Sequence, residues 1–236
     1  MSLFKNIVRE TVDFGGRQIT FETGRLAKQA AGSVLVTMGE TVVLSTATST
    51  YKPRQGMSFF PLTCDLVEKT YAAGKIPGGF FKREGRPSQV AVLASRLIDR
   101  PCRPLFPDGF MNEVQVISTV LSTDQDADPA LLGILGASAA LHISDIPWAG
   151  PIAACTLGRA DGEWVVNPSP EVIKEGATEV LLAARRDGIV MVEGGVNNLE
   201  EATVIAGLQA GFEAMTPVFE AIEALREKAG KEKRPW

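Results

Sequence analysis

The segment DPALLGILGASAALHIS, residues 128–144, constrains the fold of this chain more than any other stretch. It is apolar on every side at helical spacing, with Asp128 placed as the N-cap and Pro129 in the first turn. A helix that is hydrophobic all round belongs in a protein interior. The segment therefore predicts a buried helix that the rest of the chain has to cover.

Strand patterns lie on both sides of this helix. Alternation at period two predicts a strand over residues 17–23, and residues 33–49 read as two β-rich runs joined by a turn at Met38, Gly39 and Glu40. Further strands are predicted within residues 58–68, 112–123, 150–159, 163–166, 178–185 and 188–195. Runs of strands followed by helices in this order favour an α+β fold over an alternating parallel one.

A second helix is predicted over residues 88–101, with Ser88 as N-cap and Pro101 at its end. At 100° per residue, Arg96 and Arg100 lie side by side at the edge of its apolar face. That face is predicted to consist of Val90, Leu93, Ala94 and Leu97.

Two more helices are predicted in the C-terminal third of the chain. A short helix spans residues 170–175. A final helix starts from a capping-box pattern at Asn198 and Glu201 and is interrupted near Pro217.

A long loop, residues 69–87, separates the strand pattern of 58–68 from the helix that follows. It is punctuated by Gly74, Pro77, Gly78, Gly79, Gly85 and Pro87. Residues 75–103 carry seven basic and two acidic side chains, a net charge of +5, whereas the remaining residues carry 17 basic and 26 acidic ones, −9. Such a basic island on an acidic body is either a local anion site or a solvated basic face.

The tip of this loop combines aromatic and basic side chains. Single-stranded nucleic acid offers phosphates and flat base faces, so its binders pair cations with exposed aromatic rings. Phe80 and Phe81, followed by Lys82, Arg83 and Arg86, provide both. The alternative is that the two phenylalanines anchor the loop in the core.

The sequence offers no familiar nucleophile or metal site. His142, the only histidine, lies in the apolar helix and is predicted to be a packed core residue. Cys64, Cys102 and Cys155 are odd in number and widely spaced, which predicts reduced, packed thiols and leaves no zinc site. No apolar run is long enough to span a membrane and no secretory signal is present, so a cytoplasmic protein is predicted.

Residues 71–88, YAAGKIPGGFFKREGRPS, and residues 95–122, SRLIDRPCRPLFPDGFMNEVQVISTVLS, closely resemble the first half of the bacterial polynucleotide phosphorylase family. Residues 22–44 and 59–74 fit the same family, so that the resemblance covers nearly the whole chain. It implies an RNase PH-like α+β domain of the ribosomal protein S5 domain 2-like type, with mixed β-sheet layers and packed helices. It also implies a phosphate-dependent, reversible and processive 3'-to-5' exoribonuclease of mRNA degradation.

The resemblance assigns RNA contacts to the loop and the helix after it, and no catalytic residue or metal ligand to this chain. The RNA-binding positions are Phe80, Phe81, Lys82, Arg83, Arg86, Arg96, Arg100 and Arg103. The family's catalytic serine loop, aspartates and lysine belong to a second core. Here Glu179 lies near an aspartate position of that core and Leu181 stands where its lysine would be.

The resemblance also predicts how the chain is organised. Residues 1–230 are expected to form the first RNase PH-like core and residues 231–236 the start of a helical linker, with a second core and the KH and S1 domains absent from this chain. The expected partners are single-stranded RNA, two further copies in a homotrimer, and RNA-degradation assembly proteins.

In the full enzyme, inorganic phosphate is the expected co-substrate, and Mg²⁺ is expected in the second core. This piece alone is expected to bind and guide RNA with little activity. Two alternatives remain: a stand-alone RNase PH-type enzyme that trims tRNA, and a non-catalytic RNA-binding ring subunit.

Overall fold

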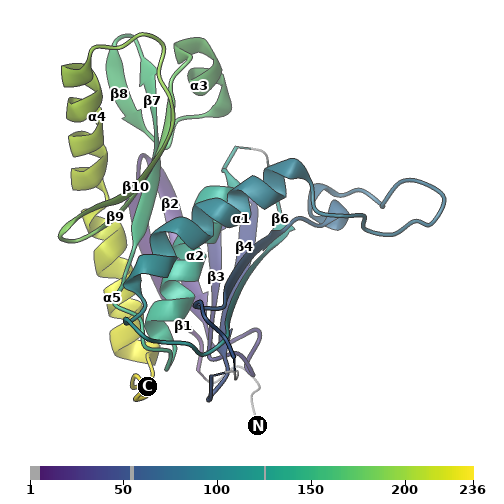
Figure 1. The fold of residues 1–236 in the computed structure, drawn as a ribbon. Helices are drawn as coiled ribbons and strands as arrows, with labels where there is room; N and C mark the ends of the chain where they lie inside the picture. Colours follow the sequence, from purple (N-terminus) through teal and green to yellow (C-terminus); the bar gives the residue numbers. More distant parts are fainter. Residues whose placement is uncertain (1–5, 54–55, 125) are drawn as a thin grey trace.

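A computed structural model describes residues 6–53, 56–124 and 126–236 of the chain, as two sheets with helices packed between and around them (Figure 1). The larger sheet has the spatial order β1-β2-β3-β4-β6-β5. Its strands are β1 (Val8–Phe14), β2 (Arg17–Thr23), β3 (Gly32–Met38), β4 (Thr41–Ser49), β5 (Leu62–Val67) and β6 (Val114–Ser122). Neighbouring strands are antiparallel except β5 and β6, which run parallel. The predicted mixed sheet is confirmed.

The smaller sheet is antiparallel, with the order β10-β9-β7-β8. Its strands are β7 (Ala153–Ala160), β8 (Glu163–Val166), β9 (Glu179–Arg185) and β10 (Gly188–Gly195). Three further helices accompany it: α3 (Pro170–Gly176), α4 (Glu201–Ala214) and α5 (Thr216–Ala229). Helix α4 covers the smaller sheet, and α5 continues along β1 of the larger one (Figure 1).

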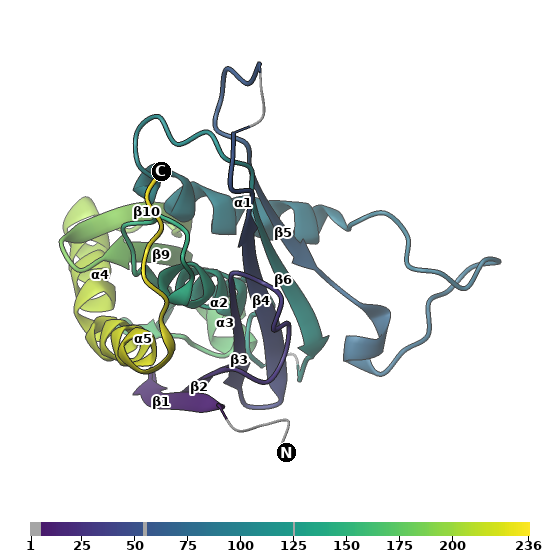
Figure 2. The same cartoon turned by 90° about the horizontal axis from the view of Figure 1, so that it is seen from below.

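The apolar helix predicted at residues 128–144 lies at the centre of the molecule as α2 (Pro129–Ile143), between the two sheets (Figure 2). Every residue from Ala130 to Ile143 is buried, against β3, β4, β7, α1 and α5. Asp128 caps its start, because its Oδ1 accepts a hydrogen bond of 2.9 Å from the amide of Ala130. This prediction is confirmed in both position and burial.

Helix α1 (Gln89–Cys102) connects the parallel strands β5 and β6, and Ser88 is its N-cap as predicted, accepting from the amide of Ala91 at 3.0 Å. Its predicted end lies within one residue of the observed end at Cys102, whereas its predicted face is wrong. The helix continues through Pro101, because a proline in the last turn removes only one main-chain hydrogen bond.

The buried face of α1 is formed by Ala91, Ala94, Ile98 and Cys102, while Val90 and Leu93 are 69% and 60% exposed. Of the predicted face, Ala94 is buried and Leu97 is partly buried. Helix α1 packs closely against β5, so the helix face with small residues is the one that becomes buried. Ser95 Oγ holds the helix in this orientation, because it accepts a hydrogen bond of 2.8 Å from the amide of Leu66 in β5.

Other elements differ from expectation in detail. Strand β1 was not predicted, the strand expected within 58–68 starts only at Leu62, and a one-turn 3-10 helix, η1 (Thr70–Ala73), begins the long loop. The capping box is wrong: Asn198 has a left-handed backbone, φ 48°, and α4 starts after Glu200 without a side-chain cap. The interruption near Pro217 is confirmed at Met215, between α4 and α5.

The three cysteines and His142 are packed residues of the core, as predicted. All three cysteines are free and buried. Burial, assisted by nearby Arg226 and Lys233, lowers the pKa of His142 to about 3, so its ring is a neutral packed group. In the described ranges, none of the helices combines the length and the apolar character that crossing a bilayer requires.

Residues 231–236 are extended and lie across the C-terminal end of α2. Lys233 Nζ donates to the carbonyls of Leu141 and Ser144, both at 2.8 Å, and the amide of Lys231 donates to Ile143. The domain limits of 1–230 and the helical linker remain predictions, and residues 1–5 lie outside the described residues.

Candidate nucleic-acid interface

Residues 74–88, between η1 and α1, extend away from the body of the molecule and form what we call the protruding loop (Figures 1 and 2). Side chains built at Gly78, Gly79 or Gly85 would meet no atom within 4 Å. Gly79 and Lys82 both have left-handed backbones, φ 74° and 50°, which turn the chain at the tip. The glycine-rich sequence thus permits an exposed loop that no other described part of the chain covers.

Phe80 and Phe81 lie at this tip, 94% and 79% exposed. Their ring centroids are 5.4 Å apart and the ring planes are nearly perpendicular, at 85°. The alternative that they anchor the loop in the core is therefore wrong. Leaving two such rings in water forgoes about 1.5–3 kcal/mol of burial for each, which leaves both available for a ligand.

At the base of the protruding loop, both limbs of the chain are hydrogen-bonded to one residue, Thr70. Its carbonyl accepts from the amide of Lys75 at 3.1 Å, on the outgoing limb. Its amide and Oγ1 donate to the two carboxylate oxygens of Glu84, at 2.9 and 2.8 Å, on the returning limb. These two hydrogen bonds, main-chain first, hold the pKa of Glu84 below its ordinary value.

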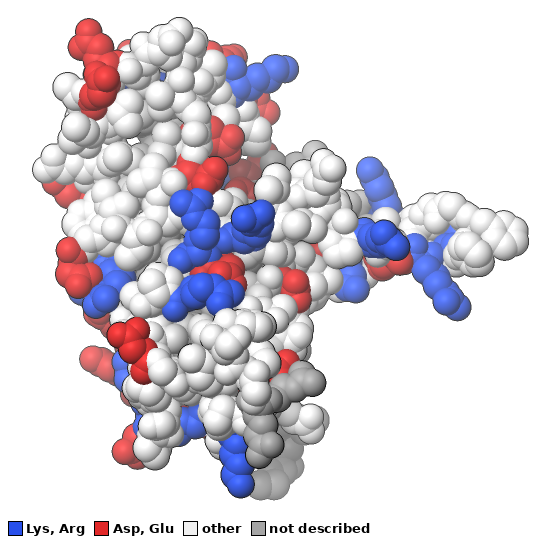
Figure 3. All heavy atoms as spheres, in the orientation of Figure 1, with Lys and Arg blue, Asp and Glu red and all other residues white. Residues whose placement is uncertain are grey.

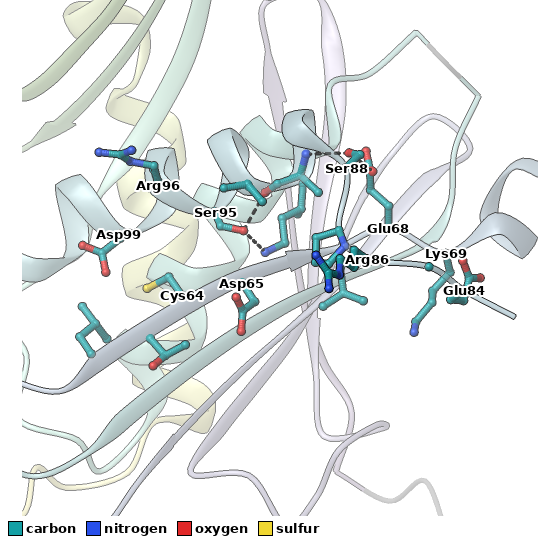
Figure 4. Close-up of a pocket in the computed structure, with 18 of the residues that line it drawn as sticks. Cys64, Asp65, Glu68, Lys69, Glu84, Arg86, Ser88, Ser95, Arg96 and Asp99 are labelled. Atoms are coloured by element: carbon teal, nitrogen blue, oxygen red, sulfur yellow. Dashed lines mark hydrogen bonds between the residues drawn. The ribbon is translucent and has the colours of Figure 1, made fainter.

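A groove of about 940 Å³ opens at the foot of this loop, between β5 and α1 (Figure 4). Arg86, Arg96, Arg100 and Arg103 are among its lining residues. Acidic groups line it as well, and Glu68 is held there by a hydrogen bond of 2.8 Å from Ser88 Oγ. The groove therefore brings four arginines of the basic island next to acidic side chains at the foot of the loop.

The arginines of the basic island fall into two groups. Arg103 donates to both carboxylate oxygens of Asp99, at 2.6 and 2.5 Å, and to the carbonyls of Phe60 and Leu62, at 3.2 and 3.1 Å. The hydrogen bond to Asp99 raises the pKa of Arg103. Arg100 pairs with Glu193 of β10.

The other predicted cations have no such partner. Within the described part of the chain, Lys82, Arg83, Arg86 and Arg96 make no ion pair. Figure 3 shows lysine and arginine side chains gathered on one face, both over the body and along the protruding loop. The structure thus brings the predicted residues into one region, and their role as RNA contacts remains a prediction.

Sequence reasoning missed the partners that shape this surface. Glu84 entered only as a charge, and Glu193 was not considered at all. Asp99 and Arg103 are four residues apart on one helix, and this spacing could have predicted their ion pair. No local signal could have paired Arg100 with Glu193, because they are 93 positions apart.

A second cavity, of about 490 Å³, lies between the start of α2 and the smaller sheet. Glu179 lines it, together with Asp126, Asp128 and Asn167, whereas Leu181 is buried. No three His, Cys, Asp or Glu side chains of residues 6–53, 56–124 and 126–236 are grouped to hold a metal ion.

Two family models match two consecutive parts of this chain. The 3' exoribonuclease family domain 1 matches residues 15–147, which include β2 to β6 and α2. The chain belongs to the 3' exoribonuclease family. Domain 2 of the same family matches residues 150–214, which include the smaller sheet and α4.

The curated relatives with high sequence identity to this chain are polyribonucleotide nucleotidyltransferases. It is 53% identical to the polyribonucleotide nucleotidyltransferase of Geobacter sulfurreducens over 94% of this chain and 32% of that protein. It is 55% identical to that of Sorangium cellulosum, over 97% of this chain and 30% of the relative. The chain therefore spans about a third of the length of these relatives.

Two solved structures of low sequence identity share the fold. Rice Rrp46 superimposes with a TM-score of 0.68 at 15% identity, covering 95% of this chain and 98% of that one. A chain of the Archaeoglobus fulgidus exosome, solved with RNA bound to its active site, gives 0.64 at 18% identity, covering 95% and 88%. The RNase PH-like fold is confirmed.

Proposed function

We propose that this chain is the first core of a polyribonucleotide nucleotidyltransferase, a phosphate-dependent 3'-to-5' exoribonuclease of mRNA degradation. Within that enzyme, its role is to bind single-stranded RNA and guide it. The observation that carries this proposal is the pair of exposed rings at the tip of a basic loop, Phe80 and Phe81. The identity of 53–55% to polyribonucleotide nucleotidyltransferases supports the choice of enzyme.

The protruding loop and its groove have the two components that a single strand requires. Successive bases stack on Phe80 and Phe81, which suits any base because every base has a flat face. Phosphates meet the unpaired cations Lys82, Arg83 and Arg86, and the strand continues along α1 past Arg96. Arg100 and Arg103 contribute positive potential while their internal partners hold them in place.

In the full enzyme we propose a cytoplasmic homotrimer that takes inorganic phosphate as co-substrate, carries Mg²⁺ in a second core, and joins RNA-degradation proteins. Phosphorolysis needs cations near the attacking phosphate and preorganised charge stabilisation. This chain has a buried leucine, Leu181, where the family's lysine is expected, and its acidic groups do not form a metal site in the described residues. The chemistry is therefore assigned to the second core.

The test of this division of labour is an assay of binding and chemistry on one sample. The chain is incubated with 3'-labelled oligoadenylate, phosphate and magnesium, and both RNA retention and labelled nucleoside diphosphate are measured. We expect binding without diphosphate. Phosphate-dependent release of diphosphate would overturn the assignment and favour an RNase PH-type enzyme that uses Glu179 and its neighbours.

The affinity for RNA is expected to fall steeply with salt. Each neutralised phosphate of a single strand contributes about −0.7 to the slope of log K against log salt, so the four unpaired cations predict a slope of about −3. Affinity for an oligoadenylate should then drop about 50-fold between 50 and 200 mM salt, as measured by fluorescence anisotropy. A slope near zero would show that the basic surface does not contact phosphates.

A further inference from the structure

Glu84 is an acidic residue in the middle of the basic surface. It lies between Arg83 and Arg86 in the protruding loop, and its side chain points back to the body, where Thr70 donates to both carboxylate oxygens (2.9 and 2.8 Å). A repulsive charge at this place opposes phosphate binding. An electrostatic role in RNA binding therefore does not explain it.

The contact closes a short segment of chain. Thr70 also binds the outgoing limb through the amide of Lys75, so residues 76–83 form a loop whose two ends meet at one threonine. No other hydrogen bond joins residues 76–83 to the rest of the described chain. Phe80, Phe81, Lys82 and Arg83 all lie within this closed segment.

The end of the protruding loop, where α1 begins, is fixed by hydrogen bonds of its own. The contact between Glu84 and Thr70 therefore restrains only the tip of the loop. Ser88 Oγ donates to Glu68 at 2.8 Å and accepts from the amide of Ala91, so α1 begins from a fixed position. Without the Glu84 contact, the free segment would lengthen from 76–83 to 76–87. The ends of a longer flexible segment are less restricted, and its side chains have more freedom to lose on binding.

We propose that Glu84 is a positioning residue for RNA capture, which orders the aromatic and basic tip of the protruding loop by binding Thr70. The proposal rests on the proposed function and adds a residue that touches no RNA. The hydrogen bonds from Thr70 lower the pKa of the Glu84 carboxyl, and its two oxygens accept both bonds at once.

This role and simple electrostatics predict opposite signs for Glu84→Ala. Removing a negative charge beside the phosphates should tighten RNA binding, by up to about 2-fold at moderate salt. Disordering the tip should instead weaken RNA binding, because the two rings and their neighbours then lose conformational entropy when RNA binds. We expect the affinity to fall about 5-fold. Glu84→Gln keeps one acceptor oxygen and should fall between the wild type and Glu84→Ala.

The experiment compares the dissociation constant for oligoadenylate of the wild-type chain, Glu84→Ala, Glu84→Gln and Thr70→Val. Glu175→Ala on α3 is the matched control, since it removes an exposed acidic residue outside the loop. Its affinity should stay within 2-fold of the wild type. In the background of Phe80→Ala with Phe81→Ala, the further change Glu84→Ala should weaken binding less than it does in the wild type, because only Lys82 and Arg83 remain to be positioned.

A second measurement reports on the tip without RNA. The rate of tryptic cleavage after Lys82 and Arg83 should rise several-fold in Thr70→Val, which removes the hydrogen bond from Thr70 Oγ1 to Glu84 and leaves the residues around the cleaved bonds unchanged. In Glu84→Ala, exchange of the Thr70 amide hydrogen should accelerate, while the melting temperature stays unchanged. Unchanged cleavage, or RNA binding as tight as or tighter than in the wild type, would overturn the proposal. If the wild-type chain itself failed to bind RNA, the proposed function would be rejected, and the cleavage rates would still test the positioning role.

Discussion

Replacing Phe80 and Phe81 together by alanine is expected to weaken the binding of single-stranded RNA about 100-fold without changing stability. Stacking of a base on an aromatic side chain contributes about 1–3 kcal/mol, so two rings at the low end of that range already supply about 2–3 kcal/mol. Both rings are exposed and contact no core residue of the described chain, so the melting temperature should shift by less than about 1 °C. Anisotropy with labelled oligoadenylate and a thermal melt give the two quantities.

The matched control is Phe59→Ala, which removes a phenylalanine that is 63% exposed but lies outside the protruding loop. We expect this variant to bind RNA within about 2-fold of the wild type. The salt slope of the double variant should also stay close to that of the wild type, because the cations remain. Equal affinity of the double variant and the wild type would show that the loop does not stack on RNA bases.

The substitution Gly136→Ala is expected to lower the free energy of unfolding by about 2–4 kcal/mol. On an exposed helix the same change raises stability by about 1 kcal/mol, because alanine is the better helix former. At this position an added Cβ would lie 2.3 Å from Ser45 Oγ and 2.9 Å from Ser45 Cβ. The clash reverses the sign of the effect, at an overpacking cost of about 1–3 kcal/mol.

The hydroxyl group that the new Cβ meets has its own buried partner. Ser45 Oγ and Ser118 Oγ are 2.7 Å apart, and Ser118 Oγ also donates to the carbonyl of Gly133 at 3.3 Å. Displacing Ser45 breaks this pair and leaves a buried hydroxyl unsatisfied, which costs a further 1–3 kcal/mol or so.

Urea denaturation measures the change, with Gly188→Ala as the control, because a Cβ there meets no atom within 4 Å. We expect Gly188→Ala to stay within about 0.5 kcal/mol of the wild type. A Gly136→Ala protein as stable as the wild type, or more so, would mean that α2 does not approach β4 this closely.

Much of the fold could be predicted because it depends on local patterns. The cap at Ser88, the capped and wholly buried α2, the hairpin of β3 and β4, and the bounds of β8 and β10 all follow from spacing within a few residues. The exposed tip of the protruding loop was one of two alternatives that the sequence left open, and glycines before the two phenylalanines with cations after them favoured it.

Other features were wrong or missed because they depend on which surfaces meet. The buried face of α1 is rotated from the apolar-looking one, because β5 accepts Ala91 and Ala94 more closely than Val90 or Leu93. Strand β1 carries a weak pattern and is held by pairing with β2 and by α5. The capping box at Asn198 failed because the residue takes a left-handed turn instead.

The amino-acid sequence by itself determined the central buried helix, the α+β layering and the aromatic and basic composition of the protruding loop. Only the tertiary structure decided which charges of the basic island are free. Arg100 is engaged by Glu193, 93 positions away, and Glu84 closes the loop on Thr70, 14 positions away. Periodicity reports contacts within one turn or strand, whereas ion pairs between distant residues form only after two sheets and a helix have packed together.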